Sequence, residues 1–115
     1  MHPVFKILRS FPPAFRGITL LIRSQTNARV HLVATLVVIV AGIWQKASAV
    51  EWGLLSLAIG LVWTAEAFNT ALEWLADRVT TEKDAKIRDL KDVAAAGVLL
   101  AAFTSLAIAG CVFFA

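Results

Sequence analysis

The chain has 115 residues, of which 59% are hydrophobic and 17% are charged. Soluble domains contain roughly 45–50% apolar and about 25% charged residues, so the composition excludes an ordinary soluble domain and favours a single domain in a lipid bilayer. The one cysteine, Cys111, excludes an internal disulfide and a cysteine-based metal cluster. The net charge of +3 comes from basic residues that flank apolar segments, which indicates a membrane protein rather than a partner of nucleic acid.

Residues 4–23 combine apolar side chains at three- and four-residue steps with arginines that recur every seven residues, at Arg9, Arg16 and Arg23. This pattern predicts an amphipathic helix on the inner leaflet of the membrane, with its arginine face toward lipid phosphates. Pro12 and Pro13 predict a break or kink between the two halves of this helix.

Three apolar segments follow and predict transmembrane helices over about residues 25–44, 52–74 and 93–115. A helix of about 20 residues spans a hydrocarbon core, and helices satisfy their own backbone polar groups where no water is present. The sequence therefore predicts an all-α integral membrane protein. Its one domain, residues 1–115, comprises the surface helix and three transmembrane helices.

Lysine and arginine are unevenly distributed among the segments that connect these helices. Ten of the 11 lie in the N-terminal region up to Arg29 or in the loop of residues 78–92, and only Lys46 lies in the turn of residues 45–51. Positive residues are enriched on the cytoplasmic side of membrane proteins. The N-terminus and the 78–92 loop are therefore expected in the cytoplasm, and the C-terminus outside.

The second apolar segment carries polar side chains that need an explanation, because an ionisable group inside a membrane costs about 2.5–3.5 kcal/mol on insertion scales. At about 100° per residue, these side chains share a helical stripe about 100° wide that cannot face lipid. They are Glu66, Asn69, Thr70, Glu73 and Asp77, and we call them the polar stripe. Carboxylate and amide oxygens are the ligands that Mg²⁺ prefers, with phosphate oxygens and water completing the octahedron.

Lys91 and Asp92 enter the third span after the basic loop. The lysine is placed to contact phosphates, and the aspartate to orient or balance it. Acidic metal ligands and a phosphate-binding lysine at a cytoplasmic opening together favour phosphoryl transfer. Two alternatives remain, since Glu66 and Glu73 could only join helices through hydrogen bonds, and Lys91-Asp92 could be an ordinary interfacial ion pair. We expect His31 to be a buried, hydrogen-bonded histidine rather than a catalytic one.

The run from Glu66 through Asn69 to Glu73, followed by Asp77 and by Lys91-Asp92-Val-Ala-Ala, resembles the signature of the prokaryotic diacylglycerol kinase family. The Gram-positive-type members of that family are undecaprenol kinases. The resemblance covers essentially the whole chain, and the spacing of its charged residues is specific.

The resemblance implies an ATP:lipid-alcohol phosphotransferase of the bacterial cytoplasmic membrane, with Mg-ATP as the donor. It also implies a homotrimer whose composite active sites lie at the cytoplasmic interface. The acceptor is a lipid alcohol, either undecaprenol or diacylglycerol, in cell-wall lipid-carrier or phospholipid metabolism. The segment Arg29-Val-His31 is similar to the undecaprenol kinase branch, but the sequence leaves both acceptors open.

Carried over by resemblance, the site residues take these roles. Glu66 resembles the general base, with Asn69 beside it, and Glu73 resembles a metal ligand. Asp77 and Lys91 resemble nucleotide contacts, and Asp92 supports the lysine. Gly17 matches a position in the surface helix. One position departs from the family pattern. Four residues before Arg29, where the family has a metal-binding glutamate, this chain has Gln25, whose amide oxygen can ligate Mg²⁺ without a charge.

Two other functional classes are compatible with a short membrane chain that contains a glutamate. A small multidrug-type transporter would have four spans and no basic loop followed by Lys-Asp. A non-catalytic membrane scaffold would not need the polar stripe. The lipid kinase explains more of the sequence than either class.

Overall fold

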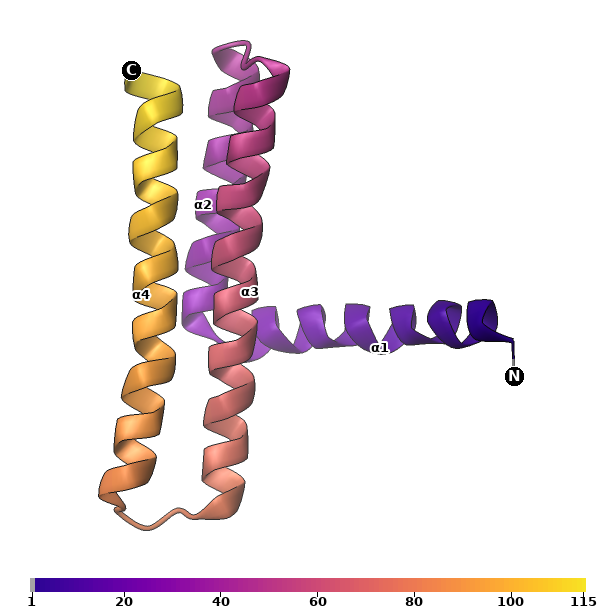
Figure 1. Cartoon of the computed structure of the whole chain (residues 1–115), viewed down its shortest axis with the longest axis vertical. Helices are drawn as coiled ribbons and strands as arrows, with labels where there is room; N and C mark the ends of the chain where they lie inside the picture. The colour runs from indigo at the N-terminus through magenta and orange to yellow at the C-terminus, as the bar shows by residue number, and fades with distance from the viewer. Residues whose placement is uncertain (1) are drawn as a thin grey trace.

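The structure is a computed structural model that describes residues 2–115, and these form four α-helices and no strands (Figure 1). The helices are α1 (Pro3–Ser24), α2 (Thr26–Trp44), α3 (Ala49–Val79) and α4 (Ala85–Phe114). Helices α2, α3 and α4 stand side by side, and α1 runs crosswise to them (Figure 1). The three upright helices have 19, 31 and 30 residues and are long and apolar enough to cross a membrane. The predicted all-helical membrane architecture is confirmed.

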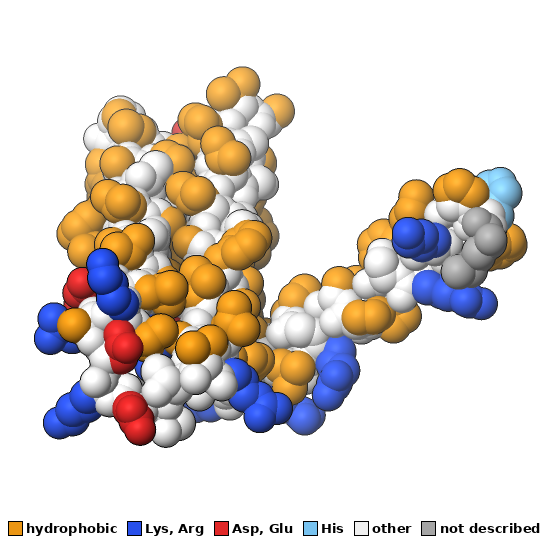
Figure 2. Space-filling model, turned by 60° about the horizontal axis from the view of Figure 1, so that its bottom comes forward, with side chains coloured by type: hydrophobic (Ala, Val, Ile, Leu, Met, Phe, Trp, Pro, Cys, Tyr) orange, Lys and Arg blue, Asp and Glu red, His pale blue; other side chains and the backbone are white. Residues whose placement is uncertain are grey.

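Helix α1 is continuous from Pro3 to Ser24, although Pro12 and Pro13 lie inside it. The predicted break is therefore wrong. Each proline removes one hydrogen bond from the helix, but the two are adjacent, so the turns on both sides keep their bonds and hold the helix together. The large apolar side chains of α1 up to Ile18 are more than half exposed, for example 59% for Phe5 and 64% for Phe15. Basic side chains lie along the same helix (Figure 2).

Backbone and side-chain hydrogen bonds shape the corner between α1 and α2. The backbone N–H of Gln25 donates to Leu21 O at 3.1 Å, and its own carbonyl accepts from Arg29 N at 3.3 Å. The Arg29 guanidinium donates to Ile22 O at 3.1 Å and to Arg23 O at 2.6 Å. The carbonyls at the end of α1, which have no partner inside the helix, are thus satisfied from the start of α2.

The turn between α2 and α3 is built by capping and by one glycine contact. Ser48 and Glu51 form a reciprocal capping box that starts α3. Trp52 packs against Gly42, where an added Cβ would lie 2.6 Å from the ring atom Cη2 of the tryptophan. Any side chain at this position would collide with the indole, so the glycine allows α2 and α3 to approach closely here.

Helices α3 and α4 are longer than the apolar segments that predict them. Asp84 caps the start of α4 by accepting from Lys86 N and Ile87 N at 2.8 and 3.1 Å, so α4 begins at Ala85 and not near residue 93. Capping residues decide where a helix starts, and hydropathy shows only how much of it can lie in lipid. As a result, α3 and α4 continue beyond the level at which α1 leaves the bundle (Figure 1).

Part of the outer side of α3, from Gly53 to Ala71, carries a row of small exposed residues at three- and four-residue steps. They are Gly53, Ser56, Gly60, Thr64, Ala67 and Ala71, and we call them the small-residue face. At about 100° per residue this face is about 80° wide, and its centre lies about 120° around the helix axis from Glu66. An added Cβ at Gly53 or Gly60 would meet no atom within 4 Å. The face is therefore open in a single copy of the chain.

Candidate active site

The polar stripe descends along α3 from the buried interior to an exposed end. Glu66, Asn69 and Thr70 are buried, with 1%, 7% and 2% of their surface exposed. Glu73 is half-buried, and Asp77 is exposed. The helical period predicts that these side chains share one face, and α2 and α4 cover the inner part of it. A carboxylate as deeply buried as that of Glu66 requires partners or a ligand.

Hydrogen bonds inside the polar stripe are long and leave two oxygens free. Thr70 Oγ1 donates to Glu66 Oε1 at 3.5 Å, and Asn69 Nδ2 donates to Glu73 Oε1 at 3.5 Å. Among residues 2–115, the buried atoms Glu66 Oε2 and Asn69 Oδ1 have no hydrogen-bond partner. A buried acceptor without a partner costs about 1–3 kcal/mol. Both atoms are therefore candidates for contact with a ligand.

His31 of α2 lies opposite Glu66. Its Nε2 is 3.5 Å from Glu66 Oε2, but neither atom forms a hydrogen bond within the described part of the chain. The helices are joined beside this pair, where Trp63 Nε1 donates to Thr35 Oγ1 at 2.9 Å and Thr35 Oγ1 donates to His31 O at 2.7 Å. The expectation that His31 is hydrogen-bonded is therefore wrong for its Nε2, because the supporting bonds reach its backbone and not its ring.

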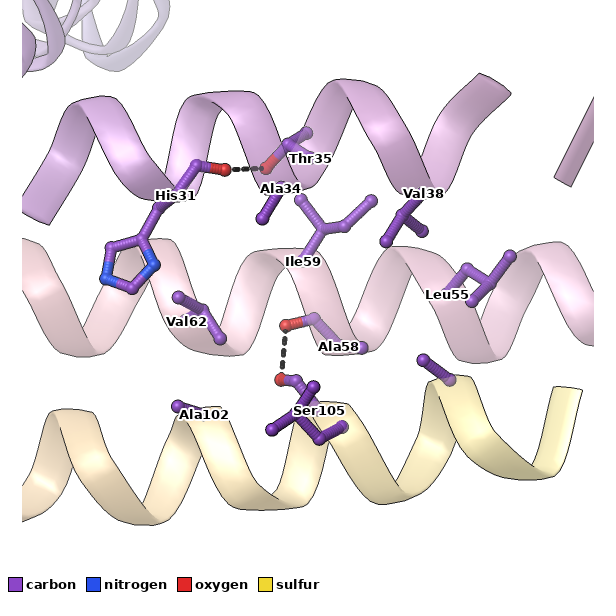
Figure 3. Close-up of a pocket in the computed structure, with 12 residues that line it drawn as sticks. His31, Ala34, Thr35, Val38, Leu55, Ala58, Ile59, Val62, Ala102 and Ser105 are labelled. Atoms are coloured by element: carbon purple, nitrogen blue, oxygen red, sulfur yellow. Dashed lines mark hydrogen bonds between the residues drawn. The ribbon is translucent and has the colours of Figure 1, made fainter. Parts of the chain in front are cut away.

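An apolar cavity of about 230 Å³ lies between α2, α3 and α4, with His31 at one end (Figure 3). The hydroxyls of Thr35 and Ser105 also line it, but each already donates a hydrogen bond, Ser105 Oγ to Ala58 O at 2.9 Å. The rest of its wall is aliphatic. The imidazole of His31 is thus the one unsatisfied polar group that the described residues place on this cavity.

Lys91 of α4 forms an ion pair with Asp77, the last residue of the polar stripe. Its Nζ donates to Asp77 Oδ1 at 2.6 Å, with 37% and 58% of the two side chains exposed. Asp92 is exposed and, among residues 2–115, forms no ion pair or hydrogen bond with Lys91. The carboxylate beside this lysine is therefore that of Asp77. Asp92 follows Lys91 directly in the helix, about 100° around its axis, and so points to another side.

Gln25 and Gly17 lie outside the polar stripe. Gln25 is half-buried at the corner between α1 and α2, and its Nε2 donates to Ser24 Oγ at 3.5 Å. The antiparallel pairing of His31 with Glu66 and of Thr35 with Trp63 brings Gln25 to about the level of Glu73. Gly17 lies in α1, where an added Cβ would meet nothing within 4 Å.

Within residues 2–115, no three His, Cys, Asp or Glu side chains cluster closely enough to hold a metal ion. A Mg²⁺ site needs fewer, because this ion usually takes one or two protein carboxylates and completes its shell with phosphate and water. The Glu73 carboxylate and the unpartnered Asn69 Oδ1 lie one helical turn apart and are both hard oxygen donors. These residues fit a magnesium ion that a nucleotide brings with it.

The arrangement places a possible proton acceptor near side chains that could bind a phosphate group and its metal ion. Glu66 Oε2 can accept a proton in a dry environment, Glu73 and Asn69 can hold a cation, and Lys91 can bind phosphate. The sequence identified these residues through helical periodicity. It did not predict that His31 lies close to Glu66. The sequence offers only one indication of this contact, which is that both are ionisable residues well inside an apolar helix.

The sequence of the chain is similar to those of proteins named as kinases of undecaprenol and of diacylglycerol. Residues 13–113 match the family described as prokaryotic diacylglycerol kinase. The chain is 32% identical to the undecaprenol kinase of Bacillus subtilis over 103 residues, which cover 90% of this chain and 84% of the relative. It is 33% identical to a diacylglycerol kinase of Synechocystis over 106 residues, covering 91% of this chain and 61% of the relative. The resemblance to the prokaryotic diacylglycerol kinase family is confirmed. The chain therefore belongs to the prokaryotic diacylglycerol kinase family and is a lipid kinase.

Proposed function

We propose that this lipid kinase uses Mg-ATP to phosphorylate the hydroxyl of a membrane lipid alcohol at the cytoplasmic face of the bacterial membrane. The observation that carries the proposal is Glu66, a carboxylate only 1% exposed with one unpartnered oxygen, inside a helix able to span the membrane. Ionisable groups at such depth mark functional sites. The relatives are named as kinases of undecaprenol and of diacylglycerol, and both of these lipids present a hydroxyl group.

In the proposed reaction Glu66 is the general base. Its Oε2 accepts the proton of the lipid hydroxyl while the hydroxyl oxygen attacks the terminal phosphorus of ATP. A positioned base contributes about 10²–10⁴-fold to rate. Asn69 lies one turn along the same face, and its buried Oδ1 has no hydrogen-bond partner among residues 2–115.

Glu73 and Asn69 are the proposed protein ligands of the metal ion, and Gln25, at about the level of Glu73, is a third. When bound, Mg²⁺ would neutralise charge on the phosphate oxygens. Four residues of helix separate Asn69 from Glu73 and seven separate Glu66 from Glu73, about 10 Å along the axis. At this spacing a triphosphate chain fits between the proposed base, Glu66, and the proposed metal ligand, Glu73.

Lys91 and Asp77 are the proposed contacts of the far part of the nucleotide. Eleven residues separate Glu66 from Asp77, which corresponds to about 16 Å along α3. The Lys91–Asp77 pair of one chain therefore cannot touch the reacting phosphoryl group at Glu66 in that chain. Asp92, exposed on the next side of α4, is proposed to support this region through the nucleotide or a neighbouring chain rather than through Lys91. Gly17 is proposed to leave room where α1 meets the bound substrates.

We also propose that the N-terminus is cytoplasmic and that the protein is a homotrimer. Basic side chains gather at the end of the bundle that carries the α3–α4 loop and along α1, which supports this orientation (Figure 2). The small-residue face of α3 supports contact between copies, because small residues allow transmembrane helices to approach closely.

The test is a transfer assay with the purified protein in detergent or in a bilayer, labelled ATP, Mg²⁺ and either undecaprenol or diacylglycerol. We expect one or both lipids to be phosphorylated. Glu66→Gln should reduce turnover about 10²–10⁴-fold, because the amide keeps the shape of the side chain but accepts no proton. Its oligomeric state should be unchanged. A variant that keeps more than about a third of wild-type turnover removes Glu66 from this role, and no product with either lipid overturns the function.

A further inference from the structure

The ring of His31 projects from α2 toward α3 and is not used to hold the helices together (Figure 3). The bond between the helices runs from the Trp63 indole to the Thr35 hydroxyl, and within α2 that hydroxyl donates to the carbonyl of His31. The Trp63 ring meets the imidazole edge-on, with centroids 6.3 Å apart. The Trp63 ring thus packs against the imidazole, and Nε2 has no hydrogen-bond partner among residues 2–115.

Nε2 of His31 and Oε2 of Glu66 are two neighbouring polar atoms that both lack a hydrogen-bond partner among residues 2–115. The atoms are 3.5 Å apart, and both are buried. We assign a proton to Nε2 because that nitrogen faces a carboxylate. A donor and an acceptor are thus side by side without satisfying each other. A hydroxyl group placed beside both atoms would satisfy them together, since it can donate one hydrogen bond and accept two.

We propose that His31 is a second contact of the acceptor hydroxyl, an inference that rests on the proposed function. The hydroxyl donates its proton to Glu66 Oε2, and its oxygen accepts a hydrogen bond from His31 Nε2–H. One lone pair of the oxygen remains, and it is the pair that attacks phosphorus. His31 thereby fixes the rotation of the hydroxyl about its C–O bond, which Glu66 alone does not fix.

The hydroxyl oxygen forms a bond to the terminal phosphorus of ATP, and the bond from that phosphorus to the bridging oxygen breaks. ADP leaves with the electron pair of the broken bond, and the hydroxyl proton passes to Glu66. His31 keeps its proton throughout, so it orients the nucleophile and is neither the acid nor the base.

The experiment compares His31→Gln, which can place an amide N–H near the position of Nε2, with His31→Met, which has no donor. Ser105→Ala is the matched control, because it removes a different hydrogen bond between membrane helices, the one to Ala58 O. For each variant we would measure kcat and KM for the lipid that the wild type phosphorylates, undecaprenol or diacylglycerol. KM for Mg-ATP and the thermal unfolding of the protein in detergent would be measured on the same samples.

We expect His31→Met to lower kcat/KM for the lipid about tenfold, the effect of one hydrogen bond to a neutral group, with KM for Mg-ATP unchanged. His31→Gln should stay within about threefold of wild type. Ser105→Ala should lower the unfolding temperature without changing the lipid kinetics. This pattern would not arise if His31 only supported the fold, because both His31 variants would then be destabilised and both substrates affected.

Three results overturn the proposal. His31→Met could retain wild-type lipid kinetics, or both His31 variants could lose activity equally while their unfolding temperature stays normal. The loss could also fall on both substrates together with lower stability, which would indicate a structural role. If the wild type phosphorylates neither lipid, the proposed function fails and the role of His31 fails with it. An active wild type with an unaffected His31→Met variant removes only the His31 contact.

Discussion

At the scale of single residues, the helical period alone brings the chemistry-bearing side chains of α3 to one face. Glu66, Asn69 and Glu73 recur at three- and four-residue steps, and these steps return to the same side of a helix. The depth of each residue does not follow from the period. Glu66 is 1% exposed and lies opposite His31 of α2, whereas Asp77 lies beyond the start of α2 and is exposed, although Lys91 of α4 contacts it.

Gln25 carries the prediction that concerns the metal ion. If its amide oxygen binds Mg²⁺, Gln25→Glu should lower the half-saturating Mg²⁺ concentration, because a carboxylate adds charge to a site for a hard cation. Gln25→Ala should raise this concentration, and Glu73→Gln should raise it more, since a charged ligand is lost from a site that already lacks one. The measurement is activity against Mg²⁺ at fixed ATP. Wild-type curves for both Gln25 variants, with a shift for Glu73→Gln, would show that Gln25 only joins α1 to α2.

At the scale of helical elements, the α2–α3 turn depends on the contact of Trp52 with Gly42. Gly42→Ala should destabilise the protein by about 1–3 kcal/mol, the usual penalty for overpacking. An added methyl group would lie 2.6 Å from the indole of Trp52, so the ring or the helices would have to move. Thermal unfolding in detergent measures this effect.

Gly97 provides the matched control for that substitution, since it also lies inside a helix but an added Cβ there meets nothing within 4 Å. Gly97→Ala should leave stability equal or higher, because alanine favours a helix over glycine by up to about 1 kcal/mol. Combining Gly42→Ala with Trp52→Leu should recover part of the loss. Additive losses in the double variant would show that the two residues do not interact.

At the scale of the whole molecule, the small-residue face of α3 predicts where copies of the chain meet. Gly60→Leu should shift the protein in detergent from the proposed trimer toward smaller species, because the leucine prevents close approach of the helices. The same change at Gly97 of α4, where the space is equally open within one chain, should leave the trimer intact. Size-exclusion chromatography with light scattering distinguishes them. Equal behaviour of the two variants would mean that copies meet through another surface.

The orientation of the bundle is also a property of the whole molecule. Ten lysines and arginines lie at or before one end of the helices, and only Lys46 lies in the opposite turn. The positive-inside rule therefore predicts a cytoplasmic N-terminus and an external C-terminus. A reporter that is active only outside the cytoplasm should be active when fused after Ala115. Activity of a cytoplasm-only reporter at that position would reverse the orientation.

The sequence by itself determined the properties that depend on local pattern. Hydropathy identified three membrane helices, periodicity identified the polar stripe from Glu66 to Asp77, and the spacing of these residues with Lys91 identified the family. Only the tertiary structure decided which side chains from different helices meet. In the structure Lys91 forms its ion pair with Asp77 and not with Asp92, and His31 Nε2 lies 3.5 Å from Glu66 Oε2. Such contacts follow from the relative register and rotation of packed helices, and these result from many weak contacts at once, among them Trp52 against Gly42.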